Sequence, residues 1–196
     1  MFSMNDDNQE SPTTVPDTGL IAEKAFESRT VLLFGTISDV SARDVAQRLI
    51  ALDTASSDPI SILVSSPGGH VESGDAIHDV VRFISSPVRM IGAGWVGSAA
   101  AHVFLAAELD NRVCLPNTRF LIHQPSGGIG GKGTDIAIQA REILLTRERI
   151  AKTIANATGQ SLEKVLSDIE RDHWLSAAEA IDYGLISRII EHRGEL

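Results

Sequence analysis

Short aliphatic runs alternate with segments of helical periodicity along most of this chain, and this alternation constrains the fold more than any other feature. The expected strands and the helices that follow them are 30–34 and 41–52, 60–64 and 74–84, and 88–93 and 98–107. Strands separated by helices usually pair in parallel. The sequence therefore predicts an α/β domain with a largely parallel sheet.

The second half of the chain continues the pattern with shorter elements. Expected strands lie at 113–115, 120–122 and 185–190, and expected helices at 134–157, 162–169 and 177–183. A length of 196 residues fits a single domain. We place that domain at 20–196, after a polar arm at 1–19 that we expect to be flexible.

The composition argues against several classes of protein. The formal net charge of −9 disfavours a nucleic-acid binder, which usually carries a basic patch. No apolar run approaches the roughly 20 residues that span a bilayer, so we expect no membrane segment and a cytoplasmic protein. Cys114 is the only cysteine, and no cluster has the spacing of metal ligands, so we expect neither metal nor cofactor.

A serine surrounded by small residues stands where an expected strand gives way to a helix, in the segment Gly94–Ala101. Small neighbours let a substrate backbone approach Ser98, and a helix N-terminus offers unpaired N–H groups. The segment differs from the Gly-x-Ser-x-Gly elbow because position 100 is alanine. Ser98 is therefore a candidate nucleophile, and the alternative is a simple helix N-cap.

The expected strand at 60–64 leads into Ser66-Pro67-Gly68-Gly69. Paired glycines can turn backbone N–H groups outward, which is the geometry that an oxyanion hole requires. The alternative interpretation is an ordinary Pro-Gly turn.

Six histidines are present, and His123 differs from the others because an apolar strand delivers it to a glycine-rich loop. It is the candidate general base. The main rival is His102, four residues after Ser98 on the same expected helix, where helical geometry would aim the ring along the axis rather than at the serine oxygen. Asp172 could orient a histidine as the third member of a triad, or could belong to a solvated charge cluster.

The order of these motifs resembles the ClpP family, the proteolytic subunits of the ATP-dependent Clp protease. Ser-Pro-Gly-Gly, Gly-x-x-x-Ser, Ile-His-Gln-Pro, Ala-Arg-Glu-Ile-Leu, Thr-Gly-Gln and Glu-Arg-Asp follow one another across residues 28–190. The resemblance implies a serine endopeptidase with the spiral fold of repeated β-β-α units shared with crotonases, and a protruding handle at about 124–157. It places the triad on Ser98, His123 and Asp172.

The resemblance also implies further site residues and partners. It puts the oxyanion donors on the backbone N–H groups of Gly69 and Ala99, and a ring–ring contact on Glu170 and Arg171. It implies a tetradecamer of two stacked heptameric rings that hydrolyses unfolded polypeptides. An AAA+ unfoldase of the Clp type would feed the chamber and would be the only component to use ATP.

Several positions depart from the family pattern. The serine motif, usually Gly-x-Ala-Ala-Ser-Met, carries Trp95, Gly97 and Ala99 here. Ser61 and Leu63 replace tyrosines, and Val113 an aromatic residue, at positions where the family forms the apolar pocket for the unfoldase.

Two other functions remain open from the residues. The altered serine motif is compatible with an inactive subunit that has a structural or regulatory role in a mixed ring. A CoA-thioester enzyme of the crotonase type shares the fold but usually carries acid/base carboxylates in its site.

Overall fold

The computed structural model describes residues 18–127 and 130–196. The strands are β1 (Thr30–Phe34), β2 (Ile60–Ser66), β3 (Val88–Gly97), β4 (Arg112–Cys114), β5 (Arg119–Ile122), β6 (His173–Ser176) and β7 (Arg188–Ile189). The α-helices are α1 (Thr18–Glu27), α2 (Asp39–Ala55), α3 (Val71–Phe83), α4 (Ala99–Phe104), α5 (Gly133–Thr158), α6 (Leu162–Asp168) and α7 (Ala177–Tyr183). Two 3-10 helices are η1 (Leu109–Asn111) and η2 (Arg193–Glu195).

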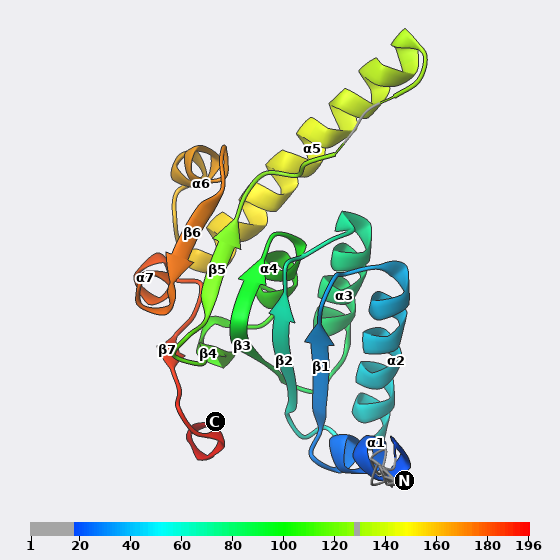
Figure 1. The fold of residues 1–196 in the computed structure, drawn as a ribbon, viewed down its shortest axis with the longest axis vertical. Helices are drawn as coiled ribbons and strands as arrows, with labels where there is room; N and C mark the ends of the chain where they lie inside the picture. Colours follow the sequence, from blue (N-terminus) through cyan, green and yellow to red (C-terminus); the bar gives the residue numbers. More distant parts are fainter. Residues whose placement is uncertain (1–17, 128–129) are drawn as a thin grey trace, which may run out of the picture.

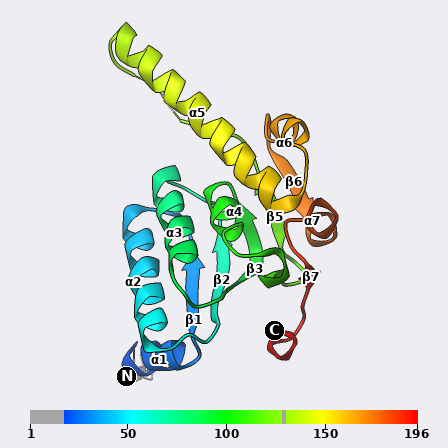
Figure 2. The ribbon, with the colours of Figure 1, turned by 180° about the vertical axis from the view of Figure 1, so that it is seen from behind.

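The sheet confirms the expected α/β class with mostly parallel pairing (Figure 1). Its main order is β1-β2-β3-β4-β7, and all these neighbours are parallel. Strand β5 also pairs in parallel with β3, and β6 joins β5 antiparallel. Figure 2 shows α3 and α4 in front of the sheet, whereas α5 projects far from the body. Among the described residues, no helix combines the length and the apolarity that a membrane crossing requires.

The core lies between the sheet and the helices α2, α3 and α4. Burial alternates along β2, where Ile60, Ile62 and Val64 point inward, as expected for a strand with one packed face. Every residue of the alanine-rich α4 is buried. Small side chains let this short helix pack close to the sheet. Ser98, which precedes the helix, is therefore held near the end of β3.

Strand β3 is longer than expected and pairs with two strands, β4 and β5, along different parts of its length. Its first half pairs with β4, from Met90 to Gly92, and its last three residues pair with β5, from Trp95 to Gly97. The backbone turns between the halves at Gly94, where φ is 64°. This turn brings the end of β5 beside the end of β3, and both candidate catalytic side chains follow those ends.

The structure also differs from the sequence-based expectations at other places, including the bounds of α3 and α4, which are Val71–Phe83 and Ala99–Phe104 rather than 74–84 and 98–107. Helix α2 is capped by Ser38 rather than Ser41, which instead occupies the third helical position of a capping box. The final strand shrinks to Arg188–Ile189. Strand β6 was not expected, and α1 begins at Thr18, two residues before the expected start of the folded domain. Residues 1–17 and 128–129 lie outside the described residues, so the flexible arm and part of the glycine-rich loop stay predictions.

Candidate active site

Ser98 lies at the junction of β3 and α4 in an unusual backbone conformation. Its φ of 53° and ψ of −123° are uncommon for a residue with a side chain. Such backbone strain costs about 1–3 kcal/mol and persists where the surrounding structure imposes it. Here the Ser98 amide donates to the Leu121 carbonyl at 2.8 Å, which fixes the serine against the end of β5.

Gly68 packs directly against the backbone of this serine. A Cβ at Gly68 would lie 2.7 Å from the Gly97 carbonyl oxygen and 2.8 Å from the Ala99 nitrogen. The φ of Gly68 is 93°, so both space and conformation require glycine at this position. The turn that follows β2 is thereby pressed against the segment that carries the candidate nucleophile.

Among residues 18–127 and 130–196, nothing accepts a hydrogen bond from the amides of Gly69 and Ala99, which leaves both available for a ligand oxygen. Ile37 and Gly69 form an isolated parallel β-bridge. The Ile37 amide donates to the Gly68 carbonyl, and the Ile37 carbonyl accepts from the His70 amide. The bridge therefore uses backbone groups on either side of Gly69, and the Gly69 N–H points away from Ile37. Ala99 is the first residue of α4, where helical N–H groups lack an internal acceptor. Within the described residues, neither amide donates to a protein acceptor.

The β5–β6 hairpin places the candidate base beside its carboxylate. Ile122 pairs with His173, so the next residues outward, His123 and Asp172, lie opposite one another. Nδ1 of His123 is 3.3 Å from Oδ1 of Asp172. The imidazole is 22% exposed and the carboxylate 66% exposed, so the histidine is the more enclosed member of the pair.

Ser98 and His123 line one small pocket. Its other lining residues are Val71, Ala99, His102, Pro125 and Ile150. Within the described part of the chain, no hydrogen bond joins the Ser98 hydroxyl to the His123 ring. The fold therefore brings the nucleophile and the base to a common cavity, and their hydrogen bond is not formed in the isolated chain.

Comparisons with known proteins identify the family of this chain. The model of the Clp protease family matches residues 17–193. The ATP-dependent Clp protease proteolytic subunit 3 of Rhizobium etli is 52% identical over 194 residues, which cover 98% of this chain and 100% of that protein. The ATP-dependent Clp protease proteolytic subunit 2 of Gluconobacter oxydans is 55% identical over 175 residues, which cover 88% of this chain and 78% of that protein. This chain belongs to the Clp protease family.

A solved structure supports the same assignment at the level of the fold. ClpP1 from Listeria monocytogenes superposes with a TM-score of 0.82 at 48% identity, covering 90% of this chain and 99% of that one. The expected family and fold are confirmed, and the chain is a serine peptidase subunit of the Clp type.

His102 is not free to act as a base in this member of the Clp protease family. Its Nε2 lies 3.0 Å from Oδ1 of Asp75, which also receives two hydrogen bonds from Arg149 at 2.6 and 2.8 Å. Burial, with the neighbouring His78 next, lowers the pKa of His102 to about 4. Burial alone would raise the pKa of Asp75, but the hydrogen bonds and charge of Arg149 lower it overall. Sequence reasoning found the position of His102 on the helix but missed these partners.

The two residues expected at a ring–ring contact lie on the surface beside α5. Glu170 forms an ion pair with Arg147 of α5 at 2.9 Å, and its carbonyl accepts a hydrogen bond from the Gln124 side chain. Arg171 is exposed. In the single chain, Glu170 therefore links the loop after α6 to the middle of α5.

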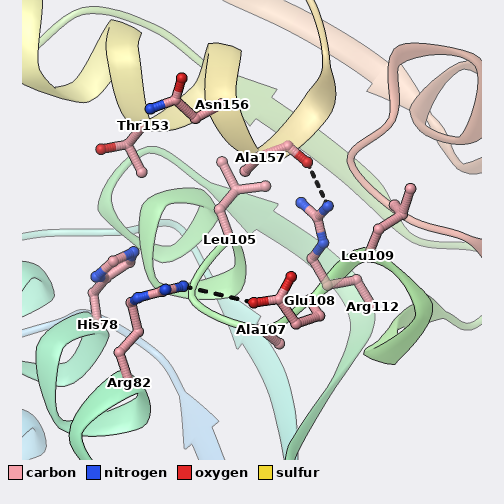
Figure 3. Close-up of a pocket in the computed structure, with 10 residues that line it drawn as sticks. All are labelled: His78, Arg82, Leu105, Ala107, Glu108, Leu109, Arg112, Thr153, Asn156 and Ala157. Atoms are coloured by element: carbon pink, nitrogen blue, oxygen red, sulfur yellow. Dashed lines mark hydrogen bonds and ion pairs between the residues drawn. The ribbon is translucent and has the colours of Figure 1, made fainter.

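A larger cavity of about 540 Å³ lies away from the candidate triad, between the ends of α3, α4 and α5. Figure 3 shows two polar contacts between its lining residues: Arg112 donates to the Ala157 carbonyl at 2.6 Å, and Arg82 lies 4.0 Å from Glu108. None of the candidate triad residues lines it. Burial lowers the pKa of Arg112 to about 10, so the guanidinium stays charged and ties β4 to the end of α5. Across the described residues, no group of three or more potential ligands could hold a metal ion.

Proposed function

We propose that Ser98, His123 and Asp172 form the catalytic triad of this peptidase, with the Gly69 and Ala99 amides as the oxyanion hole. The observation that carries the proposal is the convergence of three chain segments. A strained serine, a histidine paired with a carboxylate, and two amides that have no acceptor among the described residues lie at the ends of β2, β3 and β5.

The reaction follows from those roles. His123 removes the proton from Ser98 Oγ as the oxygen attacks the peptide carbonyl, and the developing oxyanion accepts hydrogen bonds from Gly69 and Ala99. The imidazolium, stabilised by Asp172, then gives its proton to the leaving amine as the C–N bond breaks. Water deprotonated by His123 attacks the acyl ester, and the proton returns to Ser98 as the carboxylic acid product leaves.

The absence of a Ser98–His123 hydrogen bond in the described single chain is compatible with this mechanism. Catalytic hydrogen bonds are often long without substrate and shorten when the reacting complex forms. We therefore expect assembly or substrate binding to close the gap between Oγ and Nε2. The inactive-subunit alternative predicts that the gap persists, and the CoA-thioester alternative is disfavoured by membership of the Clp protease family.

Exposed apolar side chains favour self-association, for which we propose two stacked heptameric rings. Ile138 and Leu144 on α5 are 63% and 64% exposed, and Leu32 and Phe34 on the edge strand β1 are 57% and 54% exposed. Parallel sheets are normally covered on both faces, and large apolar patches commonly mark interfaces. In that arrangement α5 enters the ring–ring contact together with Glu170 and Arg171, and native mass spectrometry should report fourteen subunits.

An apolar pocket that shares no lining residue with the pocket beside Ser98 is the proposed docking site for a Clp-type AAA+ unfoldase. It has a volume of about 250 Å³, its apolar lining consists of Leu63, Ile91, Leu115, Ile190 and Leu196, and Ser61 also lines it. Val113 is fully buried beneath these residues rather than lining the pocket. The unfoldase would use ATP and deliver unfolded polypeptide, and the subunit itself would need no cofactor. A cytoplasmic location stays a prediction for cell fractionation to test.

Replacement of the nucleophile tests the proposal directly. Ser98→Ala should abolish hydrolysis of a fluorogenic peptide while native mass spectrometry shows an unchanged assembly. Ser57→Ala, at an exposed serine far from the pocket, is the matched control and should retain wild-type turnover. Undiminished turnover in Ser98→Ala would refute the mechanism.

A further inference from the structure

The pocket beside Ser98 is unusually small for a site that must accept a side chain. The free space between Val71, Ala99, His102, Pro125 and Ile150 is about 20 Å³. A space of this size holds about one water-sized group. In the proposed acyl enzyme, the carbonyl oxygen faces the Gly69 and Ala99 amides. In this account, the side chain of the residue before the cleaved bond enters the cavity that adjoins Ser98.

One wall of this pocket is polar and belongs to a network that joins three helices. His102 of α4, only 6% exposed, lies 3.0 Å from the carboxylate of Asp75 on α3. Both oxygens of that carboxylate accept hydrogen bonds from Arg149 of α5. The neighbour of Arg149 along α5 is Ile150, which itself lines the pocket. The size of the pocket is thus linked to contacts among α3, α4 and α5.

The imidazole that forms this wall is held on more than one side. The ring of His78 stacks on the ring of His102 with 4.5 Å between centroids and an angle of 15° between planes. Asp75 pairs with Nε2 at the edge of the ring. To enlarge the cavity, His102 would have to leave both contacts, and Asp75 would lose a partner in a partly buried site. A flexible apolar side chain at this position would yield more easily.

We infer that this pocket selects substrates with a small residue, alanine or serine, immediately before the cleaved bond, and that the Asp75–His102–Arg149 network determines this selection. The inference rests on the proposed function, because it assigns the pocket to the acyl side of the cleaved bond. Leucine, methionine and phenylalanine at that substrate position exceed the space and would have to displace His102. His102 and Arg149 are specificity-determining residues in this account, and they take no part in proton transfer.

The test uses fluorogenic peptide amides that are identical except for the residue before the cleaved bond. The wild-type enzyme should cleave the alanine and serine peptides with kcat/KM at least about 10-fold above the leucine and phenylalanine peptides, since a single methylene is worth roughly 10- to 200-fold. In His102→Ala, the alanine-to-leucine ratio should fall by about 10-fold or more. Arg149→Ala should also lower this ratio, because Asp75 loses two hydrogen bonds and then holds His102 less firmly.

A matched control and an internal standard keep the test decisive. Arg48→Ala removes an arginine that pairs with Asp44 on the exposed surface of α2, and its ratio should equal that of wild type. Because both peptides are measured on one preparation, the ratio does not depend on the folded fraction. If His102→Ala yields no folded protein, the ratio measured for Arg149→Ala decides the test.

The outcomes separate this inference from the proposed function. A small fluorophosphonate probe measures the active serine independently of the substrate series. Labelling of Ser98 together with a preference for leucine or phenylalanine, or with equal ratios in the wild-type and variant enzymes, overturns the inference alone. Failure of both labelling and all peptide cleavage overturns the proposed function.

Discussion

His123 and Asp172 face each other because the β5–β6 hairpin holds them opposite, with 3.3 Å between Nδ1 and Oδ1. The aspartate is 66% exposed, so its attraction for an imidazolium is weakened by water. Its main contribution to catalysis is therefore expected to be orientation of the ring and choice of its tautomer.

The role of Asp172 predicts a large loss of turnover without loss of the fold. Asp172→Asn should reduce kcat by about 10²- to 10⁴-fold, because an amide that donates to Nδ1 would stabilise the wrong tautomer. Steady-state kinetics with a fluorogenic peptide measure the effect. Asp44→Asn, at an exposed aspartate on α2, should leave kcat unchanged, and a comparable loss in that variant would show that the assay reports stability instead.

The contact between Gly68 and the serine segment predicts that a single methyl group will disrupt the site. Gly68→Ala places a Cβ within 2.8 Å of backbone atoms at Gly97 and Ala99, so the oxyanion hole must shift. We expect peptidase activity to fall by about 10²-fold or more, as when an oxyanion donor is lost. Gly35→Ala is the matched control, because Gly35 also has a positive φ but, within the part of the chain that the structure describes, no non-neighbouring atom lies within 4 Å of its Cβ position. Equal losses in the two variants would point to backbone strain rather than to the close approach.

The buried imidazole of His102 predicts a stability change on acidification. Its folded-state pKa of about 4 lies below the ordinary value of 6.5, so the unfolded chain binds the proton more tightly. This contribution to stability is fully present above pH 6.5 and is lost as the pH falls toward 4, by at most about 3 kcal/mol. Denaturant unfolding between pH 4 and 7.5 should show a shallower dependence in His102→Gln. His192→Gln, at an exposed histidine, should keep the wild-type dependence, and identical slopes in all three proteins would contradict the account.

The apolar pocket around Leu63 predicts a separation of two activities. Leu63→Asp puts a charge into the proposed docking site, so degradation of a folded protein driven by a Clp-type unfoldase should fall by about 10-fold or more. Hydrolysis of short peptides without the unfoldase should stay at the wild-type level. Val40→Asp, at a residue 65% exposed on α2, serves as the control for added surface charge. Unimpaired unfoldase-driven degradation in Leu63→Asp would place the docking site elsewhere.

Local patterns in the sequence were sufficient for most of the fold. The strand Thr30–Phe34 and the helix Ala177–Tyr183 appear with the expected bounds, because a continuous aliphatic run and a capped segment each define their own limits. Strand β6 was missed because His173-Trp174-Leu175-Ser176 is short and follows a charged cluster. Its pairing with β5 is a contact between segments about fifty residues apart, which local periodicity does not encode.

The site was predictable to a similar degree. Each candidate residue could be placed at the end of an element, but the meeting of His123 with Asp172 depends on the unexpected β6. The Asp75–His102–Arg149 network joins three helices distant in sequence, and its members look like ordinary helical surface residues when read one at a time. Such contacts follow from packing and become visible only in three dimensions.

Covalent labelling tests the central claim most directly. The assembled wild-type protein would be treated with a fluorophosphonate, digested and mapped by mass spectrometry. A single adduct on Ser98, reduced by about 10²-fold or more in His123→Ala, is the expected result, because an alcohol without its base is a weak nucleophile. An unmodified Ser98, or modification that proceeds equally well without the imidazole, would contradict the claim that these segments cooperate in catalysis.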